Sequence, residues 1–122
     1  MTGRPPVAFR VEHAGLCGAP GVAIHGEVDV STVRALVDAL DAAIRESAGA
    51  FVVDLCEVAF LDSSGLSALL RARALLGRDA RALAVVCPPG PVRRLFEVAG
   101  VSDLLFLYDS REQASAALVP PA

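Results

Sequence analysis

The sequence contains no lysine and no tryptophan, and its 122 residues include only two histidines and three cysteines. Without lysine, the eleven basic residues are all arginines, and they are interspersed with fourteen acidic residues to give a net charge of −3. Proteins that bind nucleic acid present basic side chains gathered in a patch or stripe, and this sequence has none. Nucleic acid is therefore not an expected partner.

The scarcity of cysteine and histidine argues against metal and redox chemistry. Cys17, Cys56 and Cys87 are odd in number, and no two of them have the spacing of a metal-binding pair. Cys56 and Cys87 each close an apolar run, which is typical of small buried side chains in a reducing compartment. No cofactor and no metal ion are expected.

Long apolar runs are also absent. A membrane-spanning helix needs about 20 apolar residues, and the first residues, MTGRPPVAFRVEH, lack the apolar segment of a signal peptide. Hydrophobic residues nevertheless make up 54 % of the chain, with a mean hydropathy of +0.54, which is enough for a core. These features predict a soluble, cytoplasmic protein whose core is built from aliphatic side chains.

The apolar pattern predicts five strands and four helices in the order β-β-α-β-α-β-α-β-α. Strands are expected at 7–13, 21–26, 50–55, 82–87 and 104–108, and helices at 31–47, 65–77, 91–100 and 110–118. The later strands read as continuous apolar runs, so both faces of a largely parallel sheet should be covered. The first two strands are expected to form an antiparallel pair at one edge. We expect residues 7–118 to form a single domain, between a flexible start at 1–6 and a tail at 119–122.

Two adjacent serines follow the third predicted strand, in the segment FLDSSGLSALL (60–70). A Ser or Asp at a strand-to-helix junction usually caps the helix, which is the simplest interpretation. Asp29 or Ser31 is expected to cap the first helix in the same way.

The alternative interpretation is that Ser64 is a phosphorylation site. Asp62 and Ser63 already offer two caps, and Gly65 would cost up to about 1 kcal/mol relative to alanine while leaving bare backbone beside Ser64. A phosphate on Ser64 would lie at the positive end of the helix, where an anion is tolerated. It would add about −1.5 to −2 charges beside Asp62 and so change the local surface.

Catalytic motifs are missing from the sequence. It has no G-x-S-x-G elbow and no glycine-rich phosphate loop, and His13 and His25 both fall in the predicted edge strands. The carboxylates of Asp54, Glu57 and Asp62 flank one predicted loop, where such charges are usually solvated. The protein is therefore not expected to be an enzyme.

The segment VVDLCEVAFLDSSGLSALL (52–70) resembles the central signature of STAS domains, specifically of anti-sigma factor antagonists. GEVDVST (26–32) and PPGPVRRLFEVAGV (88–101) are similar to the segments that flank this signature in the family. The resemblance implies the α/β STAS fold, in which about four helices pack on a mixed sheet of four to five strands.

The resemblance also implies a function. Such a protein binds an anti-sigma factor that is also a GHKL-type serine kinase, and so releases a sigma factor. Phosphorylation of Ser64 by that kinase would end the binding, and a PP2C-type phosphatase would restore it. Asp62, Ser63 and Gly65 are expected to support Ser64. The expected partner-binding residues are Gly26, Glu27, Asp29, Thr32, Leu66 and Ser67. The alternative function is a STAS scaffold of a stressosome-like complex or an accessory subunit of a lipid or anion transporter.

Overall fold

Strands and helices alternate along the chain in the predicted order. The computed structural model describes residues 8–16 and 18–118, so the segments expected at 1–6 and 119–122 lie outside the described residues. The strands are β1 (Arg10–His13), β2 (Gly21–Val28), β3 (Phe51–Leu61), β4 (Leu83–Val86) and β5 (Phe106–Tyr108). The helices are α1 (Val33–Arg45), α2 (Ser63–Gly77), α3 (Pro91–Val98) and α4 (Arg111–Leu118), and a 3-10 turn at Ser102–Leu104 precedes β5.

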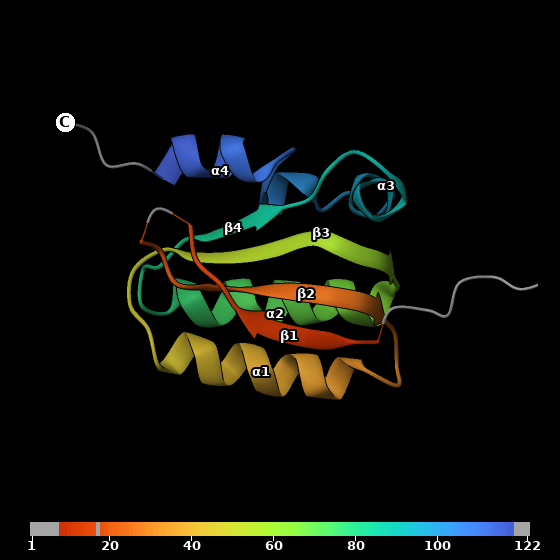
Figure 1. Cartoon of the computed structure of the whole chain (residues 1–122), viewed down its shortest axis with the longest axis horizontal. Helices are drawn as coiled ribbons and strands as arrows, with labels where there is room; N and C mark the ends of the chain where they lie inside the picture. The colour runs from red at the N-terminus through yellow and green to blue at the C-terminus, as the bar shows by residue number, and fades with distance from the viewer. Residues whose placement is uncertain (1–7, 17, 119–122) are drawn as a thin grey trace, which may run out of the picture.

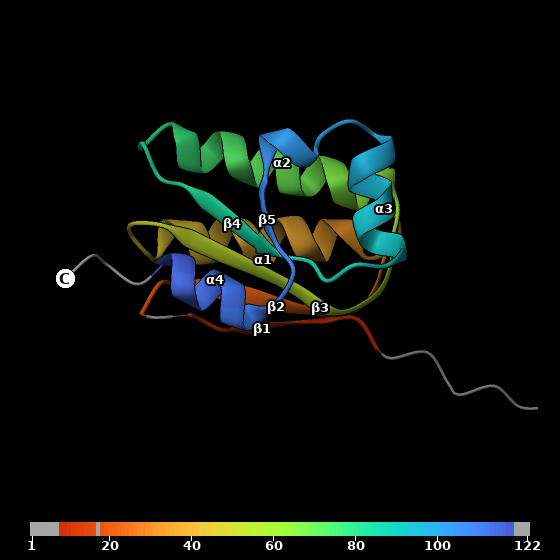
Figure 2. The ribbon, with the colours of Figure 1, turned by 90° about the horizontal axis from the view of Figure 1, so that it is seen from above.

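The strands form one mixed sheet in the order β1-β2-β3-β4-β5. β1 is antiparallel to β2, and the other three pairings are parallel, which confirms both sheet predictions. Figure 1 shows α1 and α2 on one face of the sheet and α3 and α4 on the other. Figure 2 looks onto the second face, where α4 and α3 lie over opposite ends of the strands.

The main core lies between the sheet and the α1–α2 layer. The residues that α1 buries are Leu36, Leu40, Ala43 and Ile44. A smaller apolar cluster under α4 contains Val52, Ala84, Val86 and Ala114. The two clusters cover both faces of β3 and β4, which is why these strands carry continuous apolar runs. Within the described residues, no helix is both long and apolar enough to cross a bilayer.

β3 is longer than predicted. It continues past Leu55 to Leu61, and Leu61 pairs with Val28 at the end of β2. Charged residues inside the strand interrupt the apolar run, and the pairing with β2 contains register shifts, so the sequence pattern ends before the strand does. Glu57 therefore lies within the strand and not in the predicted loop, and Asp54 lies in the middle of the strand and not near its end.

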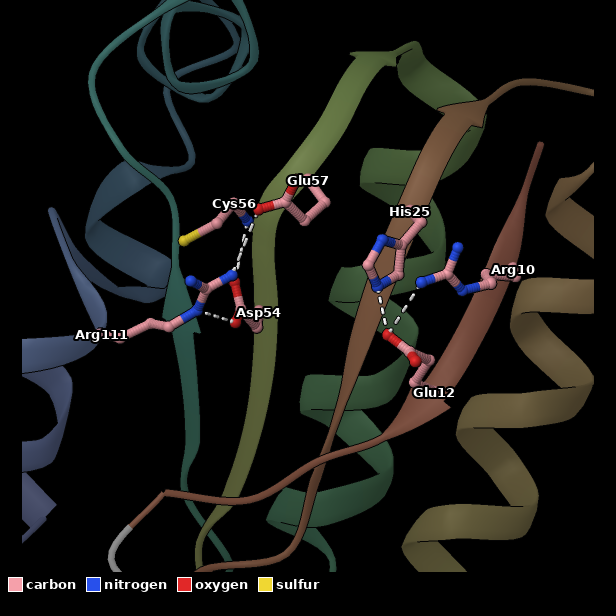
Figure 3. A network of polar contacts seen from close by, with 7 residues as sticks. All are labelled: Arg10, Glu12, His25, Asp54, Cys56, Glu57 and Arg111. Atoms are coloured by element: carbon pink, nitrogen blue, oxygen red, sulfur yellow. Dashed lines mark hydrogen bonds and ion pairs between the residues drawn. The ribbon is translucent and has the colours of Figure 1, made fainter. Parts of the chain in front are cut away.

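The expectation that the carboxylate of Asp54 is solvated was wrong. Asp54 is only 8 % exposed, because Arg111 of α4 covers it (Figure 3). The Nε atom of Arg111 donates to Oδ2 at 2.6 Å, and the backbone N–H of Cys56 donates to Oδ1 at 2.8 Å. Burial opposes ionisation of this carboxyl, but the hydrogen bonds from Arg111 and Cys56 outweigh it and hold the pKa of Asp54 below its usual value. The ion pair ties α4 to the sheet.

Replacing Arg111 with alanine is expected to reduce the free energy of unfolding by about 1–2 kcal/mol at pH 7, because it leaves a buried carboxylate with one hydrogen bond fewer. The lowered pKa means that this contribution is complete above about pH 4 and is lost as the pH falls further. Urea unfolding at several pH values tests this. The exposed Arg73, which forms no ion pair with a described residue, supplies the control Arg73→Ala. A difference between Arg111→Ala and the unchanged protein that persists undiminished at pH 3 would contradict the assignment.

A second polar cluster joins the two antiparallel strands. On β1, the Glu12 carboxylate pairs with His25 of β2 and with Arg10, as Figure 3 shows. The hydrogen bond from His25 is the largest cause of the lowered pKa of Glu12. These contacts are local to the edge of the sheet, and the serine pair lies elsewhere, after the end of β3.

Candidate functional site

The serine pair lies where β3 gives way to α2, beside the end of β2. β3 ends at Leu61, and the backbone N–H of Asp62 donates to the carbonyl of Val28 at 3.1 Å. This bond holds the β3–α2 junction against the end of β2, where the β2–α1 loop begins. Because β2 and β3 are parallel, the loops after both strands emerge at the same end of the sheet (Figure 1).

Asp62 is the N-cap of α2. One carboxylate oxygen, Oδ1, accepts from the backbone N–H of Ser64 at 2.9 Å and from that of Gly65 at 3.3 Å. The same oxygen accepts the Ser64 hydroxyl at 2.5 Å. The hydrogen bond from Ser64 is the largest cause that holds the pKa of Asp62 below its usual value. An aspartate therefore does the capping, and neither serine is needed for it.

The two serines differ in what their hydroxyls contact. The Ser64 side chain is half-buried, and its hydroxyl donates to Asp62. The Ser63 side chain is exposed, and its hydroxyl makes no hydrogen bond with any described residue. An enzyme approaching from outside would reach Ser63 without breaking a contact, whereas reaching Ser64 would break the bond to Asp62.

Gly65 faces the core, which differs from the expectation that its bare backbone opens access to Ser64. It is buried, and a Cβ atom added to it would lie 2.8 Å from Leu61 Cγ and 2.8 Å from Val28 Cγ1. The glycine therefore lets the first turn of α2 approach the ends of β2 and β3 closely.

Asp29 organises the neighbouring β2–α1 loop. Its Oδ1 atom accepts from the backbone N–H of Ser31 at 2.9 Å and from the Ser31 hydroxyl at 2.6 Å, and these bonds lower the pKa of Asp29. The Thr32 hydroxyl oxygen accepts from the Asp29 backbone N–H and donates to the Glu27 carbonyl, each at 3.0 Å. The prediction that Asp29 or Ser31 caps α1 was wrong. Thr32 occupies the N-cap position, and its side chain bonds backward into the loop.

The remaining predicted contact residues divide into exposed and buried ones. Glu27 and Ser67 are exposed and can touch a partner directly. Gly26 and Leu66 are buried, so neither offers a side chain to a partner. Gly26 has φ of +92°, a conformation that favours glycine, at the point where β2 shifts its register with β3.

The described residues contain neither a cluster that could hold a metal ion nor a thiol with a lowered pKa. No group of three His, Cys, Asp or Glu side chains in this part of the chain could hold a metal ion. Burial raises the pKa of Cys56 to about 12 and that of Cys87 to about 11, so both thiols are protonated at neutral pH. Cys17 lies outside the described residues.

Comparison with known proteins places this arrangement in a family. The family model described as "Mlab, STAS domain" matches residues 15–107. The anti-sigma-B factor antagonist of Staphylococcus aureus is 29% identical over 91 residues, which cover 75% of this chain and 84% of that protein.

Two solved structures of anti-sigma factor antagonists share the fold. One, from Mycobacterium paratuberculosis, has a TM-score of 0.84 and 29% sequence identity, and the match covers 93% of this chain and 96% of the other. The second, SpoIIAA in its unphosphorylated form, has a TM-score of 0.72 and 21% identity, covering 94% and 100% of the two chains. With a family model that spans most of its length, a matching sheet and the serine pair at the end of β3, the chain belongs to the STAS domain family.

Proposed function

We propose that this protein is an anti-sigma factor antagonist. It binds an anti-sigma factor and so releases a sigma factor, and phosphorylation of the serine pair ends the binding. The observation that carries the proposal is that Asp62 caps α2, so two adjacent hydroxyls at the helix start have no role in capping. The relatives named as anti-sigma factor antagonists support the same function.

Either serine is a candidate acceptor of the phosphate. The family resemblance implies Ser64, and a phosphate there would have to displace the bond between its hydroxyl and the carboxylate of Asp62. Ser63 is favoured as the acceptor by its exposed hydroxyl, which makes no hydrogen bond with a described residue. A phosphate on Ser63 would leave the Asp62 cap intact and would lie beside first-turn N–H groups, which lack intrahelical acceptors. We therefore give Ser63 priority and keep Ser64 as the competing site.

The partner implied by this function is an anti-sigma factor with GHKL-type serine kinase activity, and a PP2C-type phosphatase would reverse the reaction. The docking surface comprises the exposed residues of the β2–α1 loop and of the start of α2. The Ser31 bonds lower the pKa of Asp29, and the negative charge of Asp62 slightly opposes this lowering. The two carboxylates therefore interact. A phosphate added beside them would concentrate negative charge on this surface.

Phosphate mapping by mass spectrometry tests the proposal. Trypsin should release Glu46–Arg71 as one peptide, which contains Ser47, Ser63, Ser64 and Ser67. We expect the protein from its native host to carry phosphate on the serine pair, and the purified anti-sigma factor kinases of that host, with ATP, to add it in vitro. Fragment ions separate the two positions, and Ser63→Ala and Ser64→Ala show which hydroxyl is required.

The competing function makes the opposite prediction. A STAS scaffold or an accessory subunit of a transporter requires neither phosphate nor binding to an anti-sigma factor. No phosphate under any growth condition, together with no binding to any of the host's anti-sigma factors, would reject the proposed function and leave this alternative.

A further inference from the structure

An apolar groove lies between the end of β3 and α3, near the serine pair. It has a volume of about 330 Å³. Its walls are residues 59–61 of β3 and four side chains of α3, namely Pro91, Val92, Leu95 and Val98, with Arg94 at the rim. Phe60 is 49% exposed and Val98 is 78% exposed, so apolar surface remains open to solvent. Exposed apolar surface of this kind marks a site of interaction.

The groove lies next to the serine pair, at the end of β3. Leu61, one of its lining residues, directly precedes the Asp62 cap. Phe60 pairs with Glu27 at the end of β2, and the exposed Val30 follows in the β2–α1 loop, with 80% of its surface open. In Figure 1, α3 lies at the end of the sheet where β2 and β3 terminate. A partner bound over the serine pair would therefore also reach this groove.

The lining of the groove includes an arginine that forms no ion pair with a described residue. Arg94 is exposed and forms no ion pair with a described residue. Its neighbour Arg93, in contrast, pairs with Asp109 and donates to the Cys87 carbonyl. One arginine is thus used to hold the fold together, while the other is available to a partner.

From this geometry we infer that the groove is the second half of the docking surface and receives an apolar side chain of the anti-sigma factor, flanked by a carboxylate that pairs with Arg94. This inference rests on the proposed function. The groove is too small to form an interface by itself, since its lining comprises eight residues, whereas a stable complex uses about 20–30 residues on each partner. Together with the serine pair and the β2–α1 loop, it supplies the apolar centre that such an interface needs.

Binding assays with the purified anti-sigma factors of the source organism test the inference. The unchanged chain is first titrated against each of them, and the one that binds serves as the probe. Val98→Asp and Arg94→Glu are each expected to weaken binding about tenfold or more, because one places a charge in the groove and the other reverses the charge at its rim. Arg94→Lys should retain most of the affinity.

The matched control is Arg73→Glu, which makes the same charge reversal at an exposed arginine of α2 and should change the affinity by less than about twofold. Thermal melts of all four variants verify that the fold is intact. If the unchanged chain binds, and Val98→Asp and Arg94→Glu both bind as tightly as the unchanged chain, the groove assignment is overturned but the proposed function stands. Absence of any binding by the unchanged chain would overturn both. A dimer of the chain alone that Val98→Asp dissociates would assign the groove to a second copy instead.

Discussion

Aspartate at position 63 or 64 is expected to weaken binding to the anti-sigma factor by about a hundredfold relative to alanine at the same position. A fixed negative charge would lie beside Asp62 and near Asp29 on a surface that becomes desolvated in the complex. Removing an unpaired charge from water when the complex forms costs several kcal/mol, and a hundredfold change in affinity corresponds to about 2.7 kcal/mol. Titration calorimetry with the purified anti-sigma factor measures the difference.

The Ser63→Asp and Ser64→Asp variants are expected to differ in melting temperature even if both bind the anti-sigma factor equally weakly. Ser63→Asp leaves the Asp62 cap intact and adds a negative charge to the first turn of α2, so the melting temperature should stay equal or rise slightly. Ser64→Asp removes the bond between the hydroxyl and Asp62 and places two carboxylates side by side, so the melting temperature should fall.

Ala74→Asp is the control for these charges. It lies on an exposed part of α2, about 16 Å along the helix from Ser63, and should bind normally. If Ser63→Asp and Ser64→Asp both bind as tightly as their alanine counterparts, a charge-operated switch at the serine pair is rejected.

Gly65→Ala is expected to lower the free energy of unfolding by about 1–3 kcal/mol, the usual cost of overpacking a core. The added methyl would lie 2.8 Å from side-chain carbons of both Leu61 and Val28, and both of these side chains are buried. Alanine gains up to about 1 kcal/mol over glycine in a helix, which offsets only part of this cost. Because the strain falls on the first turn of α2, we also expect weaker binding of the anti-sigma factor.

Gly77→Ala provides the matched control on the same helix. Nothing lies within 4 Å of a Cβ atom at Gly77, so alanine there should leave the stability equal or raise it slightly. Chemical denaturation of the two variants compares the packed and the open end of α2. Equal stabilities of Gly65→Ala and Gly77→Ala would show that the first turn of α2 has room to move away from the sheet.

The sequence alone predicted the element order, the edge hairpin and the largely parallel sheet, because these depend on periodicity along the chain. It also located the serine pair at a strand-to-helix junction, since the apolar run, the Asp-Ser-Ser-Gly segment and the helical pattern are contiguous. The motif was sufficient to suggest the family, which the family model and the fold then showed.

How the individual side chains are used depends on contacts between elements that are distant in the sequence. Asp54 was expected to be solvated because its partner, Arg111, is 57 residues away in the sequence. Gly65 looked open because Val28, which it packs against, belongs to another strand. The groove beside α3 joins segments about 30 residues apart, so its apolar residues form no contiguous pattern. Periodicity records which face a residue occupies, whereas the identity of its neighbour depends on contacts between distant segments, which exist only once the chain has folded.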